Sequence, residues 1–280
     1  MLDIDPLRDG VTPAAAATVI VVRGAAEGPE VLLVQRHRAT AFMGGAFVFP
    51  GGRVEAGDAE PALCDRVAGL DIASAEARLG EPGLGEAARA IWVAAIRETL
   101  EEAGVLLAEE GRGRASAARA ALAAGRGFGE IATEADLRFD GARLVPLSRW
   151  VTPAVERKRF DARFFVTKVD AGEIASHDAH ETVASRWMRP ADAVASHLSA
   201  EIDLPPPTLR TLELLAPVGS ADAIVEAARA ARPPLVRPVF RDLAGQWILA
   251  LPGDAEHPEK TPVLEGTTRF VCRDARWYSR

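Results

Sequence analysis

The sequence contains few cysteines, few aromatic residues and no excess of basic residues. Of its 280 residues, 2 are cysteines and 6% are aromatic. Cys64 and Cys272 exclude a disulfide scaffold and a cysteine-ligated zinc site. Lys and Arg number 33 against 40 Asp and Glu, which gives a formal net charge of −7. This balance argues against nucleic acid as a partner, because phosphate binding normally requires a basic excess.

Long apolar segments are also absent. The run at 14–22 has nine residues, well short of the about 20 needed to cross a bilayer. Acidic residues, Asp3 and Asp5, precede it where a secretory signal would be basic. The β-branched residues in the run are typical of a buried strand instead. We therefore expect a protein of the cytoplasm that does not bind membranes.

The hydrophobic pattern predicts strands at both ends of a core, with a long helix between them. The expected strands are 18–23, 30–35, 159–169 and 185–188. The expected helices are 87–103, 114–124, 129–137, 190–198, 208–215 and 221–231. The stretch 58–86 is rich in Gly and Pro and predicts an irregular insertion with one short helix. A hairpin is expected between 240–251 and 267–272, and the prolines 205–207 predict a linker before a C-terminal appendage.

Three glutamates share one face of the helix expected at 87–103. At 100° per residue, Glu98, Glu101 and Glu102 lie within an arc of about 100°, opposite the apolar side. No Lys or Arg follows them at i+3 or i+4 to relieve their repulsion. They also lie near the helix C-terminus, where the macrodipole disfavours negative charge. A solvated helix face is one interpretation, and neutralisation by a hard divalent cation, which prefers carboxylate oxygens, is the other.

These glutamates belong to a segment that resembles the Nudix box. Residues 52–58 read GRVEAGD and residues 97–105 read RETLEEAGV. The family pattern is G-x5-E-x7-R-E-U-x-E-E-x-G-U, where U is a bulky aliphatic residue. Asp58 stands where the family usually has Glu, and 38 residues rather than seven separate Asp58 from Arg97.

The expanded box is similar to that of one branch, the Nudix-19 type, whose members are coenzyme A diphosphatases. Further segments carry this resemblance: 47–52, 95–99, 150–153, 159–165 and 251–254. The resemblance implies the α/β (α+β) class, as a Nudix-type α/β/α sandwich with a mixed sheet. The implied Nudix domain spans 10–200, with insertions at about 59–86 and 107–145. Residues 201–280 would form a helical and hairpin extension packed on the core.

The resemblance also implies roles for the box residues. Glu98, Glu101 and Glu102 would bind Mg²⁺ or Mn²⁺, with the Gly52 carbonyl as a backbone ligand. Arg97 would hold a carboxylate of the cluster in position, a bidentate role that Lys fills poorly. The ions would activate water for substitution at phosphorus in a diphosphate linkage.

Candidates for the general base and for the substrate contacts lie outside the Nudix box. Glu181, just before the strand expected at 185–188, is the candidate base, with His180 as the alternative and an ordinary surface loop as the competing interpretation. The candidate substrate-binding residues are Arg36, Arg157, Arg159 and Phe160. A solvated start of a strand explains the basic residues equally well, and burial in the core is the alternative for the aromatic one.

Three functions remain open at this point. The first is hydrolysis of coenzyme A or acyl-CoA to 3′,5′-ADP and (acyl-)4′-phosphopantetheine. The second keeps the metal chemistry and acts on ADP-ribose, dinucleotides or other nucleoside diphosphate derivatives. The third is a catalytically silent Nudix fold that binds a nucleotide, against which the intact glutamate cluster argues. All three functions imply a small-molecule nucleotide ligand. Analogy with the family suggests that the protein forms a homodimer.

Overall fold

A mixed sheet occupies the centre of the molecule. The computed structural model describes residues 11–38, 43–109, 112–176 and 182–280. Within these ranges the central sheet has eight strands in the order β10-β7-β8-β1-β2-β3, with β4 paired to β1 and β9 paired to β2. Its strands are β1 (Ala14–Ala25), β2 (Gly28–Arg36), β3 (Phe47–Val48), β4 (Gly51–Arg53), β7 (Val145–Val151), β8 (Phe160–Lys168), β9 (Thr182–Met188) and β10 (Leu235–Val236).

The remaining elements surround this sheet. A four-stranded sheet contains β11 (Val239–Leu243), β12 (Gln246–Ala250), β13 (Arg269–Arg273) and β14 (Arg276–Ser279), and a two-stranded one contains β5 (Val67–Ala68) and β6 (Phe139–Asp140). The α-helices are α1 (Pro61–Cys64), α2 (Ile72–Leu79), α3 (Glu86–Ala103), α4 (Ala115–Ala123), α5 (Phe128–Glu134), α6 (Pro190–Leu198), α7 (Pro206–Leu215) and α8 (Ala221–Ala230). Short 3-10 turns are η1 (Ala56–Ala59), η2 (Arg112–Arg114) and η3 (Gly141–Arg143).

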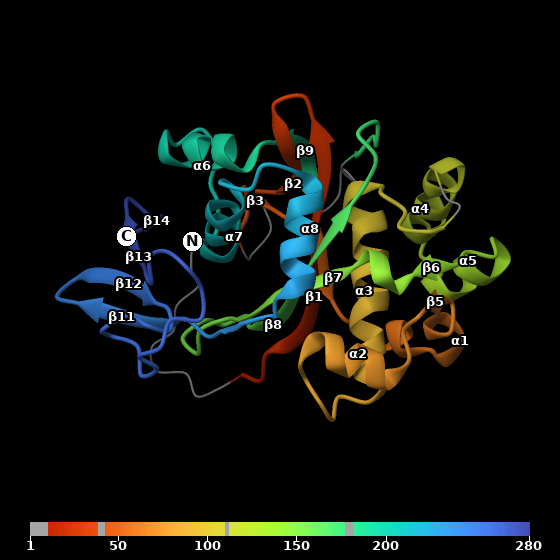
Figure 1. Ribbon diagram of the computed structural model, residues 1–280, viewed down its shortest axis with the longest axis horizontal. Coiled ribbons are helices and arrows are strands. Elements are labelled where there is room, and N and C mark those ends of the chain that lie inside the picture. Colours follow the sequence, from red (N-terminus) through yellow and green to blue (C-terminus); the bar gives the residue numbers. More distant parts are fainter. Residues whose placement is uncertain (1–10, 39–42, 110–111, 177–181) are drawn as a thin grey trace.

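Helices cover both faces of the central sheet (Figure 1). Val19 and Val21 of β1 pack in one core cluster with α3, whereas Ile20 and Val22 pack in a second cluster with α7 and α8. Because both faces are covered, β1 is apolar at successive positions instead of alternating. The expected α/β/α sandwich with a mixed sheet is confirmed, since β1 pairs antiparallel with β2 and parallel with β8.

Helix α3 is the central helix of the fold. It ends, as predicted, at Gly104, which adopts the left-handed conformation (φ 68°) that glycine tolerates best. Trp92 is fully buried, and its ring centroid lies 4.9 Å from that of Phe165 on β8. Burial extends around most of the helix and includes Glu98 and Glu102. The glutamates therefore point into the molecule, so the interpretation of a solvated helix face is wrong for these two residues.

The two insertions fold beside α3. The first contains two short helices, α1 and α2, where the sequence predicts one, because the Gly and Pro residues separate the helices rather than prevent them. The second contains α4 and α5. A parallel ladder between β5 and β6 joins the insertions, with Val67 opposite Phe139. In Figure 1 the helices α4 and α5 lie at one end of the molecule and the sheet β11–β14 at the other.

The proline run is not a linker. Pro205 is the N-cap of α7, and Pro206 is its first residue, a position where the missing N–H costs nothing. Leu209 and Leu212 of α7 pack in the same cluster as Ile20 of β1. The division of the chain into a domain ending at 200 and an extension remains a prediction.

Two further expectations concern cysteines and membranes. Cys64 and Cys272 are both unpaired thiols. Burial raises the pKa of each thiol above its ordinary value. No helix among the described residues is long and apolar enough to span a bilayer.

A buried histidine connects α6 to the C-terminal sheet. The His197 side chain is completely buried. Its Nε2 lies 2.8 Å from the carbonyl oxygen of Trp277, and its Nδ1 accepts the Leu204 N–H at 3.1 Å. One nitrogen donates and the other accepts, so the ring is neutral. Burial lowers the pKa of His197, because the charged form loses its hydration.

We expect His197 to reduce stability in acid. Below pH of about 6.5 the unfolded chain takes up a proton that the folded chain does not. The free energy of unfolding should therefore fall as the pH drops from 7 to 5. Urea unfolding at several pH values measures this effect. His197→Gln should flatten the dependence. Equal slopes for the wild type and this variant would contradict the assignment.

Candidate active site

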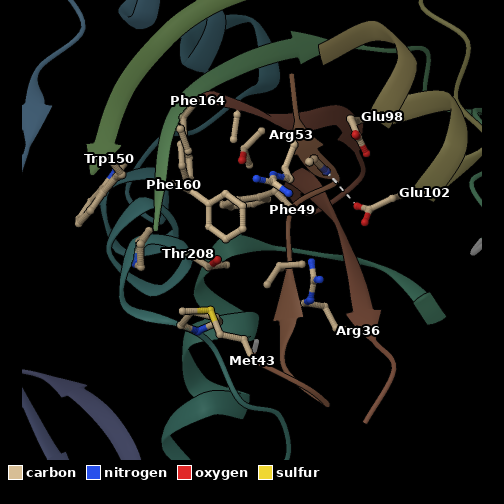
Figure 2. A pocket seen from close by; sticks show the side chains of 18 of the residues that line it. Arg36, Met43, Phe49, Arg53, Glu98, Glu102, Trp150, Phe160, Phe164 and Thr208 are labelled. Atoms are coloured by element: carbon tan, nitrogen blue, oxygen red, sulfur yellow. Dashed lines mark hydrogen bonds between the residues drawn. The ribbon is translucent and has the colours of Figure 1, made fainter. Parts of the chain in front are cut away.

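A cavity of about 920 Å³ lies beside the C-terminal half of α3. Strands β1, β4 and β8 and helices α3, α4 and α7 contribute to its lining. Glu98 and Glu102 lie on one side of it, Trp150 and Thr208 lie on the opposite side, and the Phe160 ring lies between them (Figure 2). The cavity therefore joins the Nudix-box acids to an aromatic region.

Two glycines allow β4 to approach both β1 and α3. A Cβ atom on Gly51 would lie 2.4 Å from the Ala17 carbonyl oxygen, and one on Gly52 would lie 2.4 Å from Oε1 of Glu98. The Gly51 N–H donates to Oε2 of Glu102 at 2.9 Å (Figure 2). The β1 backbone thus excludes a side chain at Gly51, whereas a side chain at Gly52 would have to displace the Glu98 carboxylate.

Arg97 ties together the carboxylates of the site. Its Nε and Nη2 donate to the two oxygens of Asp58, each at 2.8 Å, and its Nη1 donates to Glu98 and Glu101, each at 2.8 Å. Arg97 and Asp58 are 5% and 1% exposed. Asp58 also accepts the Glu55 N–H at 2.8 Å, which fixes it in the turn η1. The shorter Asp side chain therefore reaches Arg97 across the whole insertion.

Arg97 is also a cation on the helix beside the glutamates. It precedes Glu101 by four residues, whereas the positions three and four residues after each glutamate hold no Lys or Arg. The pair is an i, i+4 ion pair with its positive member on the N-terminal side. The like-charge repulsion of the cluster is thus partly relieved without any metal.

The buried charges shift one another's pKa values. Burial raises the pKa of Glu101, and Arg97 opposes this effect. Burial alone would lower the pKa of Arg97, but the hydrogen bond to Asp58 and the charges of Glu98 and Glu101 raise it above its ordinary value. Arg97 therefore stays charged at any pH at which the protein is folded.

Arg119 of α4 supports the same end of α3 and gave no signal in the sequence. Its Nε donates to the Glu101 carbonyl at 2.9 Å and its Nη1 donates to Ser176 Oγ at 2.7 Å. The Ser176 N–H in turn donates to the Ala103 carbonyl. Carbonyls of the last helical turn lack partners within the helix. A cation there is favourable, because it interacts with the negative end of the helix macrodipole. Because α4 belongs to an insertion, only the tertiary structure brings this arginine to the site.

The candidate substrate residues divide into two groups. Arg36 and Phe160 line the cavity, whereas Arg157 and Arg159 are not part of the lining. Arg159 donates instead to the carbonyls of Thr152 and Val11, at 3.1 and 2.7 Å. Lys158, between the two arginines, is the basic residue of this loop that lines the cavity. The candidate bases Glu181 and His180 lie outside the described residues.

Buried residues that the sequence did not single out complete the lining. Phe49 and Phe164 pack edge to face, with ring centroids 6.5 Å apart. Glu156, in the loop between β7 and β8, is 1% exposed and also lines the cavity. A single acid in a loop has no sequence signature, so its burial could not be predicted.

The donor set has the chemistry that a hard cation requires. Glu98 and Glu102 are 8% and 3% exposed and line the cavity beside Gly52. Within the described ranges, no three His, Cys, Asp or Glu side chains converge on one point. Glu98 faces Arg97 and Glu102 faces the Gly51 N–H. The oxygen ligands suit Mg²⁺ or Mn²⁺, and rotation of these side chains would be needed to hold an ion.

The sandwich fold and the glycine strand packed against the glutamate helix define a hydrolase of the Nudix class. The model of the NUDT19 Nudix domain matches residues 11–215. This chain belongs to that family, and it acts on diphosphate bonds.

Named relatives and a solved structure agree with this assignment. The chain is 29% identical to acyl-coenzyme A diphosphatase NUDT19 of Homo sapiens over 86% of this chain and 75% of the relative. It is 30% identical to the Gallus gallus enzyme of the same name, over 87% and 79%. A Nudix hydrolase from Alicyclobacillus acidocaldarius is 29% identical, has a TM-score of 0.64 and covers 80% of this chain and 98% of its own.

Gly52→Ala should abolish most activity, because the new methyl group would displace the Glu98 carboxylate. A displacement of about 1 Å at a catalytic group costs on the order of 100-fold in rate. Steady-state hydrolysis of a diphosphate substrate measures the loss. Gly57→Ala is the matched control, since its nearest neighbour would be 3.9 Å away. Retained activity in Gly52→Ala would show that Glu98 does not need its present position.

Arg97→Lys should lower the free energy of unfolding by about 3 kcal/mol, because an ammonium cannot replace the bidentate contact with buried Asp58. Chemical denaturation measures this change. Arg89→Lys on the same helix is the control, since its partners Asp65 and Glu86 are exposed and such pairs contribute less than about 1 kcal/mol. Similar losses for the two variants would contradict the special role of the Asp58–Arg97 pair.

Proposed function

We propose that this protein hydrolyses the diphosphate bond of coenzyme A and acyl-CoA to 3′,5′-ADP and (acyl-)4′-phosphopantetheine. The observation that carries the proposal is the site itself. Buried Glu98 and Glu102 meet Gly51 and Gly52 at one side of a 920 Å³ cavity. The relatives that share three quarters of their length with this chain are named acyl-coenzyme A diphosphatases.

The acids and the glycine strand would hold the metal. Glu98, Glu101 and Glu102 would supply carboxylate oxygens and Gly52 its carbonyl. When bound, Mg²⁺ or Mn²⁺ neutralises the diphosphate and lowers the pKa of a coordinated water. Arg97 keeps Glu98 and Glu101 oriented through its two carboxylate contacts. The Glu98 and Glu102 carboxylates would rotate towards a bound ion, while Arg97 keeps Glu98 near the site.

Other residues of the cavity would bind the substrate. Arg36 and Lys158 line the cavity and carry the positive charge that phosphate groups require. The Phe160 ring lies in the middle of the cavity, where it can pack against the substrate (Figure 2). Glu181 remains the proposed general base. We further propose a cytoplasmic homodimer, by analogy with the family.

Glu98→Gln and Glu102→Gln should each reduce kcat by about 100-fold or more, because the metal contributes several kcal/mol to transition-state stabilisation. In Glu102→Gln the new amide oxygen could still accept the Gly51 N–H, so folding should be preserved. Products from coenzyme A, ADP-ribose and NADH are separated by chromatography, with Mg²⁺, with Mn²⁺ and after chelation. Glu86→Gln, exposed at the start of α3, is the control and should remain fully active.

The products decide among the three functions. Formation of 3′,5′-ADP by the wild type, and not by the two variants or after chelation, supports the proposal. Cleavage of ADP-ribose or NADH in its place would retain the mechanism and reject the substrate. Nucleotide binding without turnover of any substrate would indicate a silent Nudix fold.

A further inference from the structure

The side of the cavity away from the glutamates has no role in the chemistry proposed above. Figure 2 places Thr208, at the start of α7, across the cavity from Glu98 and Glu102. The residues that immediately precede Thr208 also line the cavity, as do two residues from the C-terminal part of the chain. We call this set the proline wall: Pro205, Pro206, Pro207, Pro238 and Leu249.

The proline wall presents almost only hydrocarbon. Proline has no backbone N–H, and the leucine side chain has no polar atom. A nucleobase or a phosphate bound here would lose its hydrogen bonds to water without replacement, at a cost in free energy. A hydrocarbon chain needs no such partners and gains by leaving water. The chemistry of the wall therefore selects an aliphatic group.

The wall is part of the packed core, so it keeps its shape without a ligand. Leu249 is 2% exposed and belongs to the same cluster as Phe49, Trp150 and Phe164. These aromatic residues line the cavity next to the wall. The apolar region is thus continuous from the middle of the cavity to its far side.

Polar side chains also line the cavity. Thr208 follows the prolines, and Glu156 lies in the loop between β7 and β8. Both are buried, at 4% and 1% exposure. A carboxylate could also accept a hydrogen bond from the amino group of a base, so the experiment below separates an acyl group from a base.

We propose that the proline wall binds the acyl group of an acyl-CoA substrate and makes the enzyme prefer acylated over free coenzyme A. This inference rests on the proposed function. A substrate that places its diphosphate at Glu98 and Glu102 extends from there across the cavity, and the apolar wall suits the acyl end of its pantetheine arm better than its nucleotide. Pro238 and Leu249 follow the segment 11–215 that matches the family model. Acyl preference is thus set partly by the C-terminal part of the chain.

Pro207→Glu tests the wall by placing a charge in it. Pro207 is the second residue of α7, and an acidic residue in the first turn favours a helix. The variant should therefore fold. Pro207→Ala keeps the wall apolar. Pro217→Glu is the matched control, since Pro217 is exposed just after α7 and does not line the cavity.

Two measurements give the acyl preference. The first is kcat/KM for coenzyme A and for octanoyl-CoA, and the second is calorimetric binding of both compounds in the presence of a chelator. We expect the wild type, Pro207→Ala and Pro217→Glu to favour octanoyl-CoA at least tenfold in both. Pro207→Glu should lose this preference and retain kcat/KM for free coenzyme A within about twofold. Should Pro207→Glu fail a thermal unfolding check, Pro238→Ser should weaken the preference in the same direction.

Three results would overturn the inference. The wild type could bind and hydrolyse both compounds equally well, which would show that the wall does not bind the acyl group. Pro207→Glu could lower the affinity and kcat/KM for both compounds by the same factor. That result would place a part common to both compounds, such as the base, at the wall. In both cases hydrolysis of coenzyme A would persist and the proposed function would stand. Absence of binding and turnover of either compound by the wild type would overturn the proposed function as well.

Discussion

The buried contact between Arg97 and Asp58 is the interaction on which the site depends. It joins the long helix α3 to the turn η1, although 38 residues separate Asp58 from Arg97 in the sequence. The same guanidinium holds Glu98 and Glu101. Charges as deeply buried as these are tolerated only when every one has a partner. One arginine therefore closes the insertion and orients the acids, which explains why the box can be expanded without losing its geometry.

Close backbone packing is the second constraint on the site. Strand β4 lies so near to β1 and α3 that a side chain on Gly51 would meet the β1 backbone and one on Gly52 would meet the Glu98 carboxylate. Glu98 and Glu102 consequently face the strand backbone and the cavity, and both are buried. The second insertion adds Arg119, which donates a hydrogen bond to the backbone carbonyl of Glu101 near the C-terminus of α3. The acidic turn of α3 is thus held by cations from two directions, and this arrangement offsets the unfavourable helix dipole.

The cavity combines two chemistries in one space. Its acidic side comes from the Nudix box, and its apolar side comes from β7, β8, α7 and the C-terminal sheet. The two sides belong to segments that are distant in the sequence. Reaction type and substrate preference can therefore change separately, because the residues responsible for each are on different elements.

The sequence by itself determined the class of fold, the long helix with its end at Gly104, and the grouping of three glutamates on one helix face. Periodicity and the box motif are local patterns, so they can be recognised without the structure. It also named Arg36 and Phe160 as candidate substrate residues, and both line the cavity. It misjudged the prolines 205–207, which begin a buried helix, since proline marks both linkers and helix starts. Only the tertiary structure decided the burial of Glu98, the contacts of Arg119 and the lining by Lys158 in place of Arg157 and Arg159. Those features depend on contacts between elements far apart in the chain, which no local pattern records.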